Sequence, residues 1–206
     1  MSKLQTGILG GPKGKVGGVV GFRWKDKDCI RGYAIPANPN TTAQQTQRGL
    51  MKNCVAFAKL LVGQVFNKYT DKFIRSMSGF NYFVKANIKV FDGTTDYSAI
   101  KVTEGQLYAP EAVTATLGVG SVTVAFNENL GNNGAATDKV YAVCFDETTG
   151  IMYFPAAEVA RSVKAIVITV PGNVSAADLH VWCLSSRYVR TLVEMISNSV
   201  YSVVTE

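Results

Sequence analysis

The sequence predicts an α+β protein in which a glycine-rich arm with a β-hairpin and a long amphipathic helix precede a C-terminal antiparallel β-sandwich. Three observations support this class: glycines concentrate ahead of Phe22, apolar residues then recur at helical spacing, and short β-branched runs follow residue 87. Apolar residues make up 47% of the chain and charged residues 17%, which excludes a disordered chain. We expect three parts, residues 1–40, 41–87 and 88–206.

The first part combines a glycine-rich lead-in with a hairpin. Seven glycines lie between residue 7 and Phe22, and glycine at this density permits close backbone approach but weakens an independent fold. The pieces Val19–Trp24 and Cys29–Tyr33 are rich in β-forming residues, and the charged run Lys25–Asp28 separates them. We therefore expect a hairpin in a basic arm that needs a partner to become ordered.

The second part is predicted to be helical. The proline-containing stretch Pro36–Asn40 ends the arm, and Thr42 with Gln45 fits a capping box at a helix start. Apolar residues recur at helical spacing over residues 50–66, and a shorter helix over about Thr70–Lys85 follows. We expect both apolar stripes to pack on the rest of the protein, with docking into a partner's groove as the alternative.

The third part has the texture of a β-protein. Seven short β-prone runs follow one another, with Gly, Asn or Pro between most of them, which favours a sandwich of immunoglobulin or fibronectin type III character. The loop Asn127–Asp138 is expected at the surface, and the aromatic residues Phe126, Tyr141, Trp182 and Tyr201 are expected in the core. The predicted strands are Val113–Leu117, Ser121–Phe126, Val140–Phe145, Ile151–Pro155, Ala165–Val170, Leu179–Ser185 and Ser199–Val204.

Charge is unevenly distributed along the chain. Residues 1–80 hold thirteen Lys and Arg against three Asp, a net charge of +10, whereas residues 81–206 hold eight against twelve acidic residues, a net charge of −4. Such a split allows identical subunits to stack head to tail, positive surface against negative. It also allows nucleic-acid binding, although the basic residues are dispersed among glycines and do not form a run.

Residues for catalysis or metal binding are scarce. The four cysteines, Cys29, Cys54, Cys144 and Cys183, form no CxxC pair and the chain has one histidine, which excludes an ordinary zinc site. Cys144 and Cys183 could form a disulfide, or each could be a buried free thiol, and the sequence is compatible with both. His180 alternates with apolar residues and is expected on a strand, facing solvent or a neighbouring side chain. We predict no enzyme activity, no cofactor, no metal site and no small-molecule substrate. We also expect no cleaved secretion signal and no membrane span.

The hairpin is the candidate interaction site. Trp and Arg dominate interface hot spots, and basic side chains suit phosphates or an acidic protein face. The alternative is an ordinary hairpin packed on the long helix. The candidate interface residues are Lys15, Arg23, Trp24, Lys25, Lys27 and Arg31.

Two sets of motifs carry a resemblance to a known family. The N-terminal set is Gly7-Ile8-Leu9-Gly10-Gly11, Gly14-Lys15-Val16-Gly17, Val19-Val20-Gly21, Trp24-Lys25, Ile30-Arg31 and the segment Pro36–Gln47. The C-terminal set is Gly105-Gln106-Leu107, Ala136-Thr137-Asp138-Lys139, Arg161 and Ser197-Asn198-Ser199-Val200-Tyr201. On these residues the chain resembles an uncharacterised family of Bacteroidota bacteria and the phages that infect them. One departure is visible: this chain has Lys25-Asp26-Lys27 where a Trp-Lys-Gly turn looks usual in the family.

The resemblance implies a structural protein and no catalytic mechanism. It favours a component of a phage virion, a head- or tail-associated subunit that is assembled in the host cytoplasm. The arm of such a subunit would contact other copies of this protein or other virion structural proteins. A bacterial surface or filament subunit is one alternative. A nucleic-acid-binding module that uses the basic half is the other, and strong salt dependence of binding would mark it.

Overall fold

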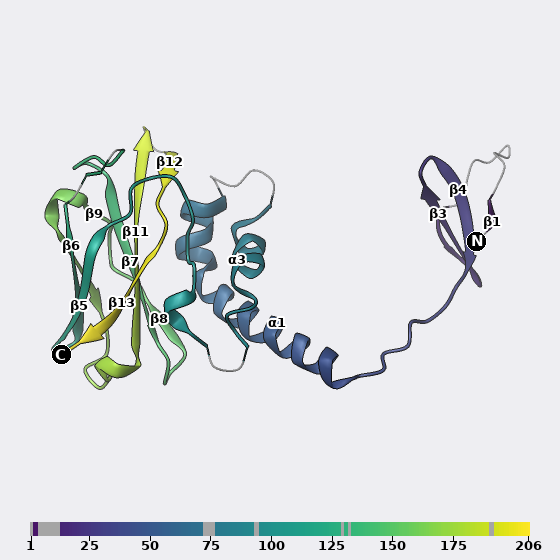
Figure 1. Cartoon of the computed structure of the whole chain (residues 1–206), viewed down its shortest axis with the longest axis horizontal. Helices are drawn as coiled ribbons and strands as arrows, with labels where there is room; N and C mark the ends of the chain where they lie inside the picture. The colour runs from purple at the N-terminus through teal and green to yellow at the C-terminus, as the bar shows by residue number, and fades with distance from the viewer. Residues whose placement is uncertain are drawn as a thin grey trace. The chain divides into compact units, whose positions relative to one another are not determined.

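The computed structural model describes residues 2–3, 13–71, 77–92, 95–128, 130–131, 133–189 and 192–206, and for residues 2–3 it describes the backbone only. The chain divides into two compact units, Met1–Thr42 and Ala43–Glu206. The described residues form a mixed α+β structure, mostly sheet, with two α-helices and two sheets (Figure 1). The predicted α+β class is confirmed.

The first unit is a four-stranded antiparallel sheet with the order β1-β4-β3-β2. The predicted hairpin is confirmed as β3 and β4. Its connection is shorter than the expected four residues, because Lys25 and Asp26 alone form the turn with φ angles of 45° and 60°. Residues 4–12 of the expected arm lie outside the described residues. The strands are β1 (Ser2–Lys3), β2 (Gly14–Val16), β3 (Val19–Trp24) and β4 (Lys27–Gly32).

The second unit opens with a long helical stretch, in which α1 (Thr42–Leu61) continues into the π-helical η1 (Val62–Thr70). The predicted amphipathic helix is therefore confirmed. The second predicted helix is found in part as α3, which spans Gly79–Asn87, and residues 72–76 of the expected range lie outside the described residues. Its start is set by Ser78, whose hydroxyl accepts a hydrogen bond from the Asn81 amide at 3.3 Å, a serine N-cap.

One helical stretch has the length of a membrane span. Residues Thr42–Thr70 form a run of 29 residues that is long and apolar enough to cross a bilayer, although the sequence pattern led us to expect no such run. A third of its most apolar window is buried within the protein. A single helix of this kind is weak evidence for a membrane, since core helices of soluble proteins share its length and composition.

All seven predicted strands are found, most with ends within two residues of those expected. Two further strands, β9 and β12, were missed because the first has two residues and the second follows β11 almost directly. The strands are β5 (Glu111–Gly118), β6 (Ser121–Asn127), β7 (Lys139–Asp146), β8 (Ile151–Tyr153), β9 (Val159–Ala160), β10 (Ala165–Thr169), β11 (Leu179–Val189), β12 (Leu192–Ile196) and β13 (Val200–Thr205).

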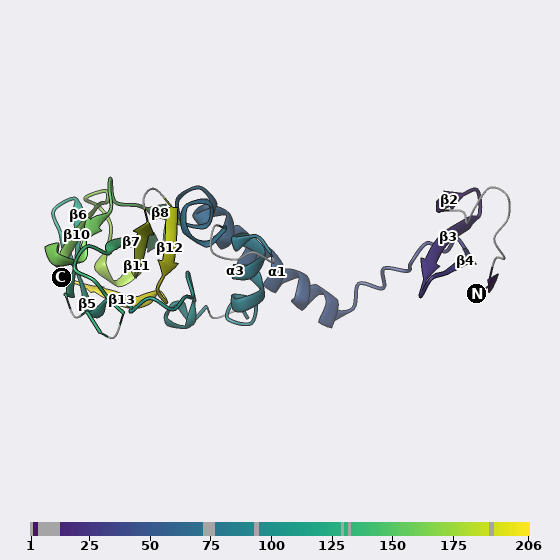
Figure 2. The ribbon, with the colours of Figure 1, turned by 90° about the horizontal axis from the view of Figure 1, so that it is seen from above.

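These strands form one nearly closed, barrel-like sheet with the order β10-β6-β5-β13-β11-β7-β8. Figure 2 shows β5, β6 and β10 opposite β7 and β11. Strand β13 joins the two sides: Val200–Val203 pair with β11 in antiparallel fashion, whereas Val204 and Thr205 pair with β5 in parallel. The expectation of a purely antiparallel sheet is corrected here, because one strand serves both sides.

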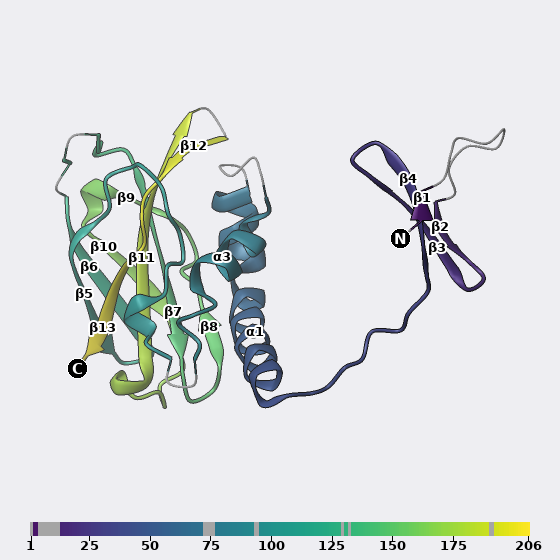
Figure 3. The same cartoon turned by 45° about the vertical axis from the view of Figure 1, so that its right-hand side comes forward.

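Two cores lie on opposite faces of β7 and β11. Alternate side chains of these strands face the barrel interior, and the others face α1, η1 and α3, which cover the outer face (Figure 3). Both strands are therefore buried on both faces, as their almost unbroken burial requires. Among the expected core aromatics, Phe126, Tyr141 and Trp182 are buried and Tyr201 is half-buried. Cys144 and Cys183 face the interior, and Trp182, Tyr141 and Leu184 face the helices.

Candidate functional site

The small sheet gathers most of the predicted interface residues on one face. Lys15 lies opposite Val20, and Val20 lies opposite Arg31, so the three form one row across β2, β3 and β4. Two further rows follow along β3 after Val20. Phe22 pairs with Cys29, and Trp24 pairs with Lys27. Because side chains of directly paired residues point to the same side of a sheet, these rows form one basic and aromatic face. We call it the hairpin face.

The remaining two predicted residues lie at the edge of this arrangement or behind it. Lys25 is in the turn, and its ammonium group lies 5.1 Å from the centre of the Trp24 ring. Arg23 alternates to the opposite face, where it pairs with Asp26 at 3.5 Å between exposed side chains. An exposed pair of this kind stabilises the turn little. The structure therefore brings five of the six residues together and excludes Arg23.

Aromatic rings on the hairpin face are covered by cations. The Lys15 ammonium group lies 3.7 Å from the centre of the Tyr33 ring, and the Arg31 guanidinium lies 5.8 Å from the Phe22 ring. Such contacts orient long basic side chains along an apolar surface. Trp24 nevertheless remains 56% exposed.

Few of the described side chains of this unit are buried. Between residues 13 and 42, only Gly21 and Cys29 are buried, while large apolar side chains stay exposed. The exposed large apolar residues in this range are Val16, Val19, Trp24, Tyr33 and Ile35. Because apolar burial is the main favourable contribution to folding, the sheet has little of its own to stabilise it.

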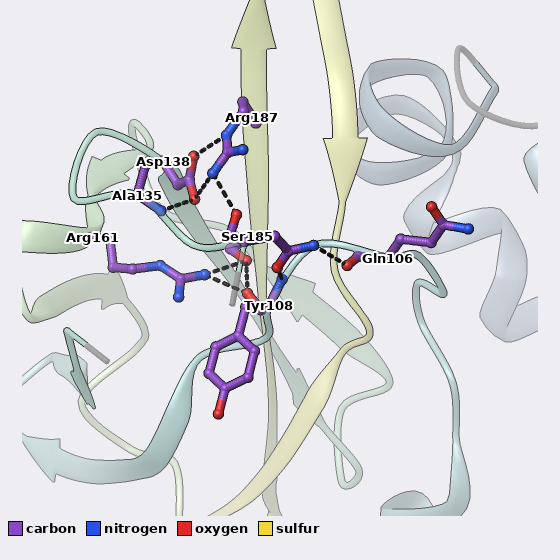
Figure 4. Close-up of polar contacts among 8 residues, drawn as sticks. Gln106, Tyr108, Ala135, Asp138, Arg161, Ser185 and Arg187 are labelled. Atoms are coloured by element: carbon purple, nitrogen blue, oxygen red, sulfur yellow. Dashed lines mark hydrogen bonds and ion pairs between the residues drawn. The ribbon is translucent and has the colours of Figure 1, made fainter. Parts of the chain in front are cut away.

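Three residues of the C-terminal motifs, Gln106, Asp138 and Arg161, meet in a polar network in the second unit (Figure 4). The guanidinium of Arg161 is fully buried and donates to the Tyr108 carbonyl and to the Ser185 hydroxyl, the latter at 2.7 Å. Asp138, also buried, accepts two hydrogen bonds from Arg187 at 2.7 and 2.9 Å. Burial lowers the pKa of Arg161, whereas the bond to Asp138 raises the pKa of Arg187. Both cations are bound to fixed partners, which indicates a structural role.

The same network fastens the segment between the helices and β5 to the sheet. Asn133 accepts from the Tyr108 amide at 2.9 Å and donates to the Gln106 carbonyl at 2.6 Å. Gly105 is needed at the adjoining contact, because a Cβ there would lie 2.0 Å from the Ile196 carbonyl oxygen. The motif residues therefore maintain the fold of this segment. No local sequence pattern indicates that they meet, because they are distant along the chain.

A second polar cluster surrounds Glu158, which sequence reasoning missed. Its carboxylate accepts from Lys68 at 2.8 Å, from the Tyr188 hydroxyl at 2.6 Å and from Tyr69. Burial favours a higher pKa for Glu158, but the three hydrogen bonds outweigh it and lower the pKa. This carboxylate lines a pocket of about 490 Å³ together with Lys139 and other polar residues. Its charge is already neutralised by Lys68, so it is a poor proton donor near neutral pH.

The remaining candidates for chemistry have structural surroundings. Among the described residues, His180 is hydrogen-bonded to Tyr201 at 2.8 Å and lies 3.4 Å from Glu147, and neither partner is the serine, threonine or cysteine that a histidine base activates. All four cysteines are free and buried, and burial raises the pKa of the Cys144 and Cys183 thiols to about 12. Within the described residues no group of His, Cys, Asp and Glu side chains could hold a metal ion.

The search of curated proteins found no match for this chain. A scan of protein families matched residues 11–202 to one model, described as a family of unknown function (DUF6266). The match covers both units and includes the hairpin face and the Arg161 network. The chain belongs to the DUF6266 family of unknown function.

Proposed function

We propose that this protein is a non-catalytic assembly subunit that contacts its partner through the hairpin face. The observation that carries the proposal is the combination of an exposed basic and aromatic face with a sheet that buries almost nothing. Small sheets need a covered apolar face to be stable, and Trp and Arg at the centre of an interface supply much of its affinity. A partner that covers the hairpin face would provide the missing burial.

We further propose the kind of assembly to which the protein belongs and the type of fold of its second unit. The resemblance to proteins of Bacteroidota phages supports a virion component, a head- or tail-associated subunit, with no enzymatic role. For the second unit we propose an immunoglobulin or fibronectin type III fold. Three strands (β10, β6, β5) opposite four (β13, β11, β7, β8), with a parallel β5–β13 contact, support it. A β-sandwich of this kind is a rigid domain, which suits a scaffold that carries the hairpin face.

The test compares the full-length protein with a version that begins at Thr41, a cut just before the boundary between the units. We expect the full-length protein to form oligomers in light scattering and defined rings, tubes or shells in electron microscopy, and the shortened version to be a monomer. The shortened version keeps both cores of the second unit. Identical monomers that bind neither each other nor a co-expressed particle protein would overturn the proposal.

Nucleic-acid binding is the second candidate, since Lys15, Lys27 and Arg31 share a face with Trp24. Cations that contact phosphates beside an aromatic ring that stacks on a base are the elements of single-strand binding. In a mobility-shift assay, this candidate requires affinity that falls steeply as salt rises. Absence of a shift at low salt, together with self-association, would exclude it.

A further inference from the structure

The second unit contains a shallow, mostly apolar pocket of about 380 Å³. One wall is the α1 surface around Ala56 and Leu60, and the other is formed by Phe91, Tyr97 and Phe145. Its volume is at the lower end of the ~300–1,000 Å³ of pockets that bind small molecules, a size suited to a single large side chain. Leu60 remains exposed on its rim. All of the pocket's lining residues belong to the second unit. Three of them, Phe57, Phe91 and Phe145, are buried in the core between the sheet and the helices.

Carboxylates lie beside this pocket. The Glu147 carboxylate lies 3.4 Å from the His180 ring, and that ring stacks on the Tyr97 wall residue with 4.0 Å between the ring centres. Two exposed aspartates are neighbours of wall residues in the chain. Asp92 directly follows Phe91, and Asp96 directly precedes Tyr97. Lys52 and Lys59 are exposed on α1 within about one helical turn of Ala56, whereas Asp92, Asp96 and Glu147 all lie outside this helix.

The hairpin face presents the matching chemistry. Trp24 is exposed at the end of β3, with Lys25 beside its ring and Lys27 directly paired with it. We infer that Trp24 of one copy inserts into this pocket of a second copy, with Lys25 and Lys27 facing the carboxylates of Glu147 and Asp96. This inference rests on the proposed assembly function and names its partner, a second copy of this chain.

Such a contact joins two different surfaces, so each copy has one donor and one acceptor. Repetition of a heterologous contact produces a ring if the rotation closes and a filament if it does not. The donor and the acceptor can therefore be inactivated separately.

The experiment uses two full-length variants. Trp24→Ala removes the donor, and Ala56→Lys places a cation in the pocket at an exposed helix position that tolerates lysine. We expect each variant alone to self-associate at least roughly 30-fold more weakly than the wild type, as for loss of a hot-spot residue. Mixed in equal amounts, they should form a 1:1 dimer in light scattering, because one intact donor meets one intact acceptor.

Matched controls test the position of the contact. Ala43→Lys makes the same change at an exposed site of α1 outside the pocket, and Ile35→Ala removes an exposed apolar side chain outside the small sheet. Both should associate as the wild type does. The chain has two tryptophans and Trp182 is fully buried, so acrylamide quenching reports on Trp24. Quenching should fall as the wild-type protein associates and should remain strong in Ala56→Lys.

The outcomes separate this inference from the function on which it rests. If the full-length protein assembles through residues 1–40 but Ala56→Lys has no effect, the pocket is not the acceptor and only the inference fails. Monomers in the mixture of variants also overturn it. A full-length protein that stays monomeric overturns the inference as well, and binding of a nucleic acid or another particle protein would then identify the true partner.

Discussion

The two units of the chain use the same element, an antiparallel sheet, in opposite ways. In the second unit, β7 and β11 are buried on both faces, between the barrel interior and the helices. In the first unit, four paired strands surround only two buried residues in the range 13–42. Hydrogen-bonded register alone gives a sheet its geometry, but apolar burial gives it most of its stability. The difference indicates that most of the apolar burial that stabilises the protein lies in the second unit.

The two tryptophans give the largest expected contrast. Trp182→Ala should lower the free energy of unfolding by roughly 3–5 kcal/mol, because a fully buried indole leaves a cavity against Phe57 and Tyr201. At protein concentrations low enough to keep both proteins monomeric, Trp24→Ala should change it by less than about 0.5 kcal/mol, as for an exposed site. Urea unfolding followed by circular dichroism measures both. Equal losses would mean that the small sheet has a core of its own.

The buried cation of the second unit gives the next largest effect. Arg161→Leu should destabilise by roughly 2–3 kcal/mol, since the Tyr108 carbonyl and the Ser185 hydroxyl each lose a charge-assisted bond. The Tyr108 carbonyl keeps one bond, from Ser185 at 2.9 Å. Lys164→Ala, at an exposed cation paired with Glu128, is the control and should cost under about 1 kcal/mol. A similar loss in both variants would contradict a structural role for Arg161.

The carboxylate of Glu158 predicts a dependence on pH. Its pKa is lowered in the folded protein, so its stabilising contribution is complete above the unfolded pKa and is lost as pH falls through the folded value. Glu158→Gln should therefore cost roughly 1–2 kcal/mol at pH 7. The difference from the wild type should shrink at acidic pH in thermal melts taken across pH. Glu194→Gln, at an exposed site, should show no such convergence, and a constant difference for Glu158→Gln would refute the prediction.

The smallest effect is expected in the hairpin turn. Lys25 and Asp26 both adopt positive φ angles, which suit Asn-Gly in a two-residue turn. The double change Lys25→Asn and Asp26→Gly should stabilise the hairpin by about 0.5–1 kcal/mol. Slower hydrogen exchange at the Trp24 and Lys27 amides, which face each other across the hairpin next to the turn, would show the gain. Faster exchange would show that the Arg23–Asp26 pair or the lysine matters more than the backbone strain.

Local patterns were sufficient for most elements of the fold. The seven expected strands and the long helix are present, since each depends on periodicity within a short window. The start of α3 was predictable from Ser78 as an N-cap, but the apolar stripe alone led to a helix that begins too early. Strand β12 and the parallel contact of Val204 depend on which strands meet in space, which no local pattern encodes.

The candidate site shows the same division. The basic and aromatic composition of the hairpin was visible in the sequence, and alternation along β3 was enough to separate Arg23 from Trp24. The polar clusters were not visible. Asn133 and Tyr108 are 25 residues apart, and Lys68 and Glu158 come from different parts of the second unit. The pocket around Ala56 likewise requires knowledge of how α1 sits on β7.

The double burial of β7 also restricts where the chain can change in length. One inserted residue within this strand would turn every side chain beyond it to the other face and exchange the residues of the two cores. No nearby substitution could compensate for such an exchange. The turn between β5 and β6 has no such restriction, because Val119 at its tip is fully exposed. Family members should therefore differ in length at this turn and never within β7, and an inserted peptide tag should be tolerated there.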